Sequence, residues 1–314
     1  MITKNTWING IKSGLRTTWQ LGKIVFPITL VVTILQHTPL LELIVSFFAP
    51  IMKWFGLPGD AAIALTLGNL LNLYAGIGAI LTMDLTVKEV FILSVMLSFS
   101  HSLPIETAVA SKIGVKAWLM ALIRLSLAFV SALLINWLWK GGQTMAQYGM
   151  MPGKQAPEID RWSDIALSGI QTSLWGILQI AAIIIPLMIA IELLKDIRAL
   201  PYLAKALTPL TRLLGVSEKT SFTLMAGLTF GLVSGAGVMI QAAQEEDLSK
   251  RDLYLISIFL VACHAVVEDT LIFIPLGVNI LPLFLIRFIV ALIITILVAN
   301  IWKKIEDNNA QRAA

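Results

Sequence analysis

Long apolar runs recur along the whole chain. Most are about 20 residues long or longer, and about 20 residues is the length that an α-helix needs to cross the hydrocarbon core of a bilayer. Only 13% of the residues are charged, whereas a soluble domain has about 25%. The sequence therefore predicts an all-α integral membrane protein that spans the lipid bilayer several times.

The chain also repeats its own pattern once. Prolines and glycines of the first half have identical partners 159 residues later, and after four extra residues in the second copy the offset becomes 163. Thirteen identical residues match in order with this single gap, among them the pairs Pro27 and Pro186, Gly68 and Gly227, His101 and His264, Thr107 and Thr270, and Arg124 and Arg287. We therefore predict two homologous halves.

The repeat divides the chain into four parts: a first repeat (7–140), a polar linker (141–165), a second repeat (166–304) and a tail predicted to be cytoplasmic (305–314). Each repeat offers five apolar segments, so we expect about ten membrane segments. They lie near 17–37, 40–55, 61–82, 89–110 and 117–139, and near 166–194, 199–214, 219–242, 252–275 and 279–302. The second segment of each half is short, and is either a tilted span or a re-entrant helix.

An odd number of crossings in each half predicts that the two copies have opposite orientations in the membrane. With the N-terminus in the cytoplasm, the cytoplasmic side collects about twice as many Lys and Arg residues as the other side, as the positive-inside rule requires. We therefore expect both termini in the cytoplasm. Inverted repeats with a binding site at their interface are typical of secondary transporters.

A polar cluster occurs at matching positions of the two halves, inside apolar segments. It consists of His101, Glu106 and Thr107 in the first half, and His264, Glu268, Asp269 and Thr270 in the second. Ionisable groups at membrane depth usually mark a functional site. An alternative is that each histidine and carboxylate only join neighbouring helices.

The local pattern around each histidine suggests how the cluster is arranged. Glu268 follows His264 by four residues, so on a regular helix both would share one face. Pro104 lies between His101 and Glu106 and predicts a break in that helix. Carbonyl groups freed by such a break can join side chains in binding an ion or a polar ligand.

Two arginines, Arg124 and Arg287, lie inside the last apolar segment of each half. Each either reaches the lipid headgroups, neutralises Glu106 or Asp269, or binds an anionic group of a substrate.

Two glycine pairs, Gly76 with Gly78 and Gly235 with Gly237, occupy the third segment of each half. They indicate either close helix packing or unwound backbone that faces a ligand. Neither pair is followed by a phosphate-binding motif, so the sequence does not indicate nucleotide hydrolysis.

The glycine and proline positions resemble a known family. The first half reads Gly14-Leu … Val25-Phe-Pro-Ile … Phe48-Ala-Pro … Phe55-Gly-Leu-Pro … Gly68 … Ala75-Gly-Ile-Gly, and the second half reads Ile185-Pro … Leu207-Thr-Pro … Leu214-Gly-Val … Gly227 … Ser234-Gly-Ala-Gly. This pattern resembles the nucleoside-recognition or Gate domain of bacterial inner-membrane proteins. Similar domains occur in spore-maturation membrane proteins, in the ferrous-iron transport protein B and in concentrative nucleoside transporters. This chain lacks the GTPase domain and the cysteine-containing gate motif of the iron transporter, which argues against iron transport.

From these features we expect a secondary-transporter-like carrier, not an enzyme. It would move a small polar or anionic substrate, nucleoside-like or lipid-linked, by alternating access, with coupling to protons through the paired histidines and carboxylates. The predicted substrate-binding residues are His101, Glu106, Thr107, His264, Glu268, Asp269, Thr270, Arg124, Arg287, Gly76, Gly78, Gly235 and Gly237.

Other functions stay open at this point. A divalent-metal carrier would use His101, Glu106, His264 and Glu268, because imidazole and carboxylate suit such ions. A membrane scaffold or sensor subunit would transport nothing. We expect no cofactor and no nucleic-acid partner, and a homo-oligomer is compatible with the sequence. Only one cysteine, Cys263, is present, so an internal disulfide is excluded.

Overall fold

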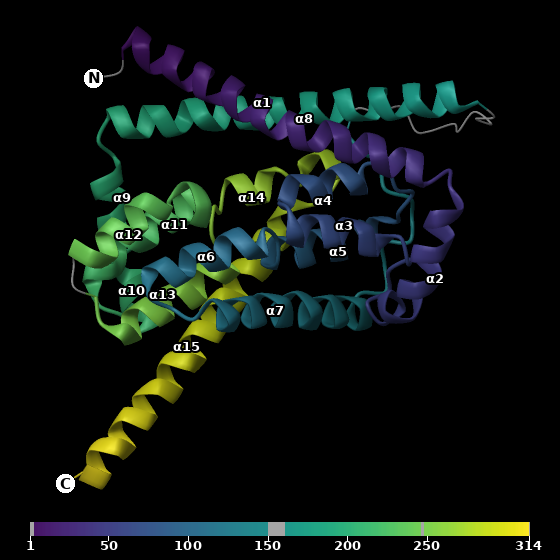
Figure 1. The fold of residues 1–314 in the computed structure, drawn as a ribbon. Coiled ribbons are helices and arrows are strands. Elements are labelled where there is room, and N and C mark those ends of the chain that lie inside the picture. Colours follow the sequence, from purple (N-terminus) through teal and green to yellow (C-terminus); the bar gives the residue numbers. More distant parts are fainter. Residues whose placement is uncertain (1–2, 150–160, 246–247, 314) are drawn as a thin grey trace.

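The computed structural model describes residues 3–149, 161–245 and 248–313, and these residues form helices and no named strand (Figure 1). The elements of the first half are α1 (Lys4–Leu35), α2 (Pro39–Trp54), α3 (Ala61–Leu70), α4 (Leu73–Ile80), α5 (Val87–Phe99), α6 (Leu103–Ile113) and α7 (Ala117–Leu138). Those of the second half are α8 (Trp162–Asp196), α9 (Leu200–Ala206), α10 (Thr208–Leu214), the 3₁₀ turn η1 (Glu218–Thr220), α11 (Ser221–Ser234), α12 (Ala236–Glu245), α13 (Lys250–Ala262), α14 (Glu268–Leu271), the 3₁₀ turn η2 (Ile274–Leu276) and α15 (Ile280–Ala313). The expected all-α class is confirmed.

Within the described residues, five helical stretches are long and apolar enough to cross a membrane. They are Lys4–Leu35, Val87–Ile113, Ala117–Leu138, Trp162–Asp196 and Ile280–Asn309. Several other predicted segments are divided into shorter helices, such as α3 and α4, or α9 and α10. Part of the predicted linker, residues 150–160, lies outside the described residues.

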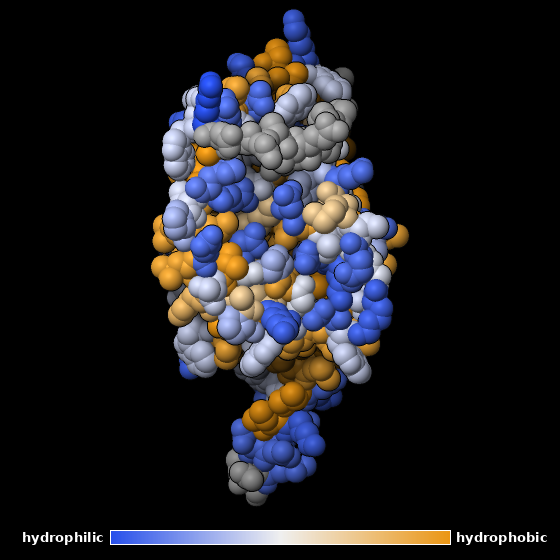
Figure 2. All heavy atoms as spheres, turned by 90° about the vertical axis from the view of Figure 1, so that its right-hand side faces the viewer, coloured by the Kyte–Doolittle hydropathy of each residue, from blue (hydrophilic) through white to orange (hydrophobic). Residues whose placement is uncertain are grey.

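The long helices expose large apolar side chains. Trp19 on α1, Leu174 on α8, Trp137 on α7 and Ile293 on α15 are each about half exposed or more. On a soluble protein such a surface would be unfavourable, but in a bilayer it faces lipid. At the end of the bundle near α2, hydrophilic side chains are mixed with hydrophobic ones (Figure 2), and Leu43, Phe47 and Trp54 of α2 are among the exposed apolar side chains.

The core of the bundle lies around α5 and α13, the two equivalent helices that precede the histidines. Ten of the thirteen residues in each of these helices are buried. Helix α5 packs on α7 and α15, and α13 packs on α15 and α7, so each central helix contacts elements of both halves. The two halves therefore share one core.

The first helices of the two halves, α1 and α8, pack against each other along their length (Figure 1). Gly10 lies against Ile189 and Gly14 against Ile185, whereas Gly169 of α8 lies against Thr33, so the two helices run antiparallel. The spacing of Gly10 and Gly14 is the small-residue spacing that lets membrane helices approach closely. A Cβ atom would lie only 2.7 Å from the Ile189 Cα at position 10, and 2.8 Å from the Ile185 Cα at position 14.

The first part of the linker is attached to the first half by backbone hydrogen bonds. The Val87 amide donates to the Thr144 carbonyl at 2.9 Å, and the Ala146 amide donates to the Leu85 carbonyl at 2.8 Å. These bonds hold residues 144–146 across the start of α5.

This packing predicts that Gly10 and Gly14 are required for stability. We expect the Gly10→Ala, Gly14→Ala double variant to unfold at a lower temperature than the wild type, with a loss of about 1–3 kcal/mol, because the contacted atoms are backbone and cannot turn aside. Thermal unfolding of the purified protein in detergent measures this. Gly237→Ala is the control, since no atom lies within 4 Å of a Cβ there and alanine is favoured over glycine in helices. Equal melting temperatures for the two variants would contradict the close α1–α8 packing.

Candidate functional site

Both histidines lie at breaks between helices. Helix α5 ends at Phe99 and α6 begins at Leu103, while α13 ends at Ala262 and α14 begins at Glu268. The residue after each histidine has left-handed backbone, with φ of 47° at Ser102 and 41° at Ala265. Non-glycine residues adopt this conformation at a cost, and such positions concentrate at functional sites.

A hydrogen bond to a carbonyl of another helix holds each break. The Ser102 amide donates to the Gly68 carbonyl at 2.9 Å, and the Ala265 amide donates to the Gly227 carbonyl at 3.0 Å. The predicted break near Pro104 therefore lies at His101 itself. The residue equivalent to Pro104 in the second half is Val267, so a proline cannot explain both helix breaks. What the two breaks share is a backbone amide, that of Ser102 or Ala265, that donates to another helix.

The same break fixes the orientation of each imidazole. His101 Nδ1 lies 2.6 Å from the Leu97 carbonyl oxygen, and His264 Nδ1 lies 2.9 Å from the Leu260 carbonyl oxygen. A carbonyl only accepts, so Nδ1 is the donor in both rings. The Nε2 atoms therefore point away from their own helices, and the ring centroids lie 5.3 Å apart.

Two carboxylates meet these Nε2 atoms, one from each half. Glu106 lies 3.1 Å from His101 Nε2 and 3.4 Å from His264 Nε2. Asp269 lies 3.9 Å from His101 Nε2 and 3.4 Å from His264 Nε2. All four side chains are buried. We call these four residues the His–carboxylate cluster.

Each carboxylate of the cluster has an arginine behind it. Arg124 pairs with Glu106, and Arg287 lies 3.4 Å from Asp269. Arg124 Nε also donates to the Phe99 carbonyl at 2.9 Å, and Arg287 donates to the His264 carbonyl at 2.8 Å. Both side chains are fully buried. Among the sequence-based alternatives, the geometry thus agrees with neutralisation of the two acids, and not with arginines that reach headgroups.

The two threonines differ in their contacts. Thr107 donates to the Leu103 carbonyl of its own helix at 2.5 Å. Thr270 is within 3.3 Å of Arg287 and helps to position that guanidinium.

The expected pairing of Glu268 with His264 is wrong. Glu268 accepts a 2.5 Å hydrogen bond from the Tyr74 hydroxyl of the other half, and Asp269 takes the place beside the histidine. The four-residue rule fails here because residues 263–267 are not helical. For the same reason Asp269 replaces Glu268 in the metal-ligand set: among the described residues, His101, His264 and Asp269 can each offer an atom within 4.8 Å of the others.

The glycine pairs do not form the unwound backbone facing a ligand that was one of the two interpretations of the sequence. Gly76 and Gly78 lie inside helix α4, where Gly76 packs against Leu97 and Gly68. The irregular backbone lies instead at Leu71 and Asn72 in the first half and at Gly231, with φ of 78°, in the second. Gly76, Gly78, Gly235 and Gly237 do not line the cavity that is formed by the described residues.

The His–carboxylate cluster is part of the lining of a cavity of about 350 Å³. Sixteen of its lining residues form eight pairs that are equivalent by the repeat: Leu71 with Phe230, Asn72 with Gly231, Leu73 with Leu232, Tyr74 with Val233, His101 with His264, Ser102 with Ala265, Ile105 with Glu268, and Glu106 with Asp269. Thr17, Gln20 and Leu21 of α1 complete the lining. The cavity therefore lies where equivalent parts of the two halves meet.

Sequence reasoning missed several of these lining residues. Tyr74 and Gly231 were not predicted, although Tyr74 lies just before the Gly76 and Gly78 pair. The signal that finds them is the repeat offset applied to whole segments, because equivalent residues of both halves line the cavity even where their side chains differ.

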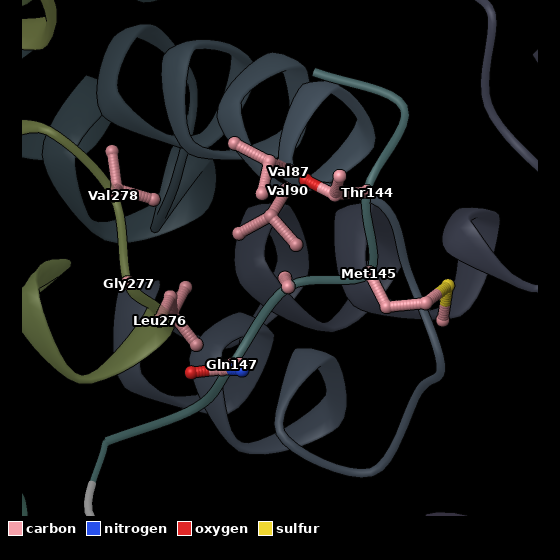
Figure 3. Close-up of a pocket in the computed structure, with 9 residues that line it drawn as sticks. Val87, Val90, Thr144, Met145, Gln147, Leu276, Gly277 and Val278 are labelled. Carbon is pink, nitrogen blue, oxygen red and sulfur yellow. The ribbon is translucent and has the colours of Figure 1, made fainter. Parts of the chain in front are cut away.

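A second cavity, of about 460 Å³, lies between the linker and the chain after η2 (Figure 3). Its lining is Val87, Val90, Thr144, Met145, Ala146, Gln147, Leu276, Gly277 and Val278. None of these side chains is ionisable, so this cavity lacks the chemistry of the first.

Two stretches of the chain, residues 18–116 and 177–278, match the model of the Gate family, which is described as nucleoside recognition. One match lies within each predicted half, and the expected resemblance is confirmed. The chain is also 52% identical over 301 residues to the uncharacterized membrane protein YvoD of Bacillus subtilis (strain 168), with 96% of each chain covered. No solved structure matches this chain. The chain is thus a membrane protein that belongs to the Gate family and carries two copies of the domain.

Proposed function

We propose that this protein is a carrier, in which a small polar solute binds in the central cavity and leaves on the opposite side of the membrane by alternating access. The observation that carries this proposal is the lining of the cavity by eight repeat-equivalent pairs, the His–carboxylate cluster among them. In carriers built from inverted repeats, the site lies at the repeat interface and is formed by broken helices. The position of the cavity between repeat-equivalent segments, and the helix breaks at His101 and His264, support the proposal.

The proposed topology has ten membrane segments in two inverted halves, with both termini in the cytoplasm of a bacterial cell. The antiparallel packing of the equivalent helices α1 and α8 supports this arrangement. Five segments per half invert the second copy, and an even total returns the C-terminus to the side of the N-terminus.

The difference between α1 and α8 suggests how the second state is formed. Helix α1 contributes Thr17, Gln20 and Leu21 to the cavity, whereas the equivalent residues of α8 do not line it. Gln179, the equivalent of Gln20, has a buried amide without a hydrogen-bond partner among the described residues. We infer that in the opposite state the two helices exchange roles, so that Gln179 faces the cavity and Gln20 is covered.

The size of the cavity favours a small solute. Ligand pockets are usually about 300–1,000 Å³, so a cavity of about 350 Å³ suits a nucleoside-sized or smaller molecule better than a lipid-linked precursor. Each arginine is enclosed, is paired with a carboxylate and does not line the cavity, so the arginines do not present an anion site to a solute there. Because the family is described as nucleoside recognition, nucleosides are the first solutes to test.

The exchange of roles predicts opposite accessibility for two equivalent residues. In a Cys263→Ser background, which places serine as at Ser100 of the first half, we expect Gln20→Cys to react with a membrane-impermeant thiol reagent from one side only. Gln179→Cys should react from the other side only. Labelling of sealed right-side-out and inside-out vesicles measures both.

The Cys263→Ser parent, labelled in the same way, gives the background. Labelling of Gln179→Cys from the same side as Gln20→Cys, or from neither side, would contradict alternating access and favour a scaffold or sensor subunit.

Removal of the cluster histidines should abolish transport. We expect the His101→Ala, His264→Ala variant to lower uridine uptake into proteoliposomes at least about tenfold, since an unmade hydrogen bond to a buried polar group costs on the order of 1–3 kcal/mol. His37→Ala is the matched control, because His37 is the third histidine of the chain and is exposed. Equal uptake by both variants and the wild type would remove the cluster from the transport mechanism.

A further inference from the structure

We infer that the His–carboxylate cluster binds a divalent transition-metal ion, through His101, His264 and Asp269, with Glu106 as the fourth neighbour. This inference rests on the proposed function, because it names what the proposed carrier holds in its cavity. It is carried by three features of the cluster: the distances between its donor atoms, the orientation of its imidazoles and its opening to the cavity.

The first feature is the spacing of the donor atoms. Metal–ligand distances of about 2.0–2.2 Å place neighbouring ligands of a tetrahedral ion about 3.3–3.6 Å apart. Both Nε2 atoms lie near one oxygen of Asp269, at 3.9 Å for His101 and 3.4 Å for His264. They also lie near Glu106, His101 at 3.1 Å from Oε1 and His264 at 3.4 Å from Oε2. Donor atoms of His101, His264 and Asp269 all lie within 4.8 Å of one another. Small side-chain movements would bring these atoms onto one ion.

The second feature is the orientation of the imidazoles. Metal-binding histidines usually donate their other ring N–H to a carbonyl or carboxylate, which fixes the ring. Both Nδ1 atoms donate to carbonyls, those of Leu97 and Leu260. In the neutral rings, each Nε2 then presents a lone pair to carboxylate oxygens that also only accept. A cation between these atoms turns this repulsive contact into coordination.

The third feature is the surroundings of the cluster. His101, His264, Glu106 and Asp269 all line the cavity, so an ion can enter and leave through it. Arg124 and Arg287 already balance the two carboxylates, which weakens their attraction for a cation and favours exchange over permanent binding. The nitrogen and oxygen donors suit ions such as Zn²⁺ and Mn²⁺ rather than Cu(I), which prefers sulfur.

Metal binding by the full-length protein in detergent tests this inference. After treatment with a chelator, we expect the protein to bind one Mn²⁺ or Zn²⁺ per chain in equilibrium dialysis, with a dissociation constant on the order of micromolar. His264→Ala should weaken binding at least about 100-fold, because it removes a ligand and not only an outer-shell contact. His37→Ala should bind as the wild type does.

Glu268→Gln separates the structural ligand set from the set expected from sequence. Because Glu268 is bonded to Tyr74 and Asp269 faces the histidines, this variant should keep its metal affinity, whereas Asp269→Asn should lose it. The reverse order would overturn the assigned ligands.

A spectroscopic measurement on the wild-type protein tests the ligands without relying on variants that could misfold. Bound Mn²⁺ should show magnetic coupling to the nitrogens of two imidazoles in pulsed electron paramagnetic resonance. Absence of stoichiometric binding, or binding without nitrogen coupling, would overturn the inference.

The labelling experiment on Gln20 and Gln179 keeps the two proposals apart. Opposite-side labelling without metal binding would leave a carrier of another solute. Metal binding, with the Gln20→Cys and Gln179→Cys variants labelled from the same side, would leave a metal site in a protein that does not alternate.

Discussion

The site depends on two backbone amides that leave their own helices. The amides of Ser102 and Ala265 donate to the carbonyls of Gly68 and Gly227 on other helices, and each change of partner forces left-handed backbone that costs about 1–2 kcal/mol. A side chain at Gly68 or Gly227 would meet a leucine of the broken helix, Leu97 or Leu260. These are the leucines whose carbonyls hold the two imidazoles. The packing of the glycine, the break in the helix and the orientation of the histidine therefore depend on one another, and this arrangement occurs once in each half.

The buried charges complete this arrangement. A charged residue at the centre of a membrane helix costs about 2.5–3.5 kcal/mol on insertion, and an apolar core of equal volume is often at least as stable as a buried ion pair. Stability alone therefore does not explain why this core contains the ion pairs Arg124–Glu106 and Arg287–Asp269. Each arginine also binds a carbonyl beside a break, that of Phe99 or His264, so it compensates for backbone groups that the helix no longer satisfies. The charges and the breaks support each other, and together they leave the two Nε2 atoms facing the carboxylates of the cluster.

The sequence predicted the helical class and the meeting of the two histidines well, because hydrophobic runs and repeat offsets do not depend on local detail. It failed where the backbone departs from a regular helix. Glu268 was assigned to His264 by helical spacing, yet the chain between them is irregular, and Asp269 is turned inward instead. Gly76 and Gly78 suggested unwound backbone, but their small size serves packing inside α4, and the irregular residues precede them. The hydrogen bond between Tyr74 and Glu268 joins residues far apart in the sequence, and no local sequence pattern predicts such a contact.

The two halves have equivalent helix breaks, but some of the equivalent side chains that line the cavity differ. The shared and the differing side chains would therefore have different roles. Histidines stand at both equivalent positions, next to both breaks. In contrast, Tyr74 and Glu268 are bonded to each other across the interface, while their equivalents, Val233 and Ile105, are apolar and about half exposed. If the halves exchange roles, a symmetric part functions in the same way in both states, whereas an asymmetric bond must break in one of them. The Tyr74–Glu268 hydrogen bond would thus stabilise the present state over its opposite. The paired histidines would hold their ligand equally in both states, and the unpaired contacts would decide which side the empty protein faces.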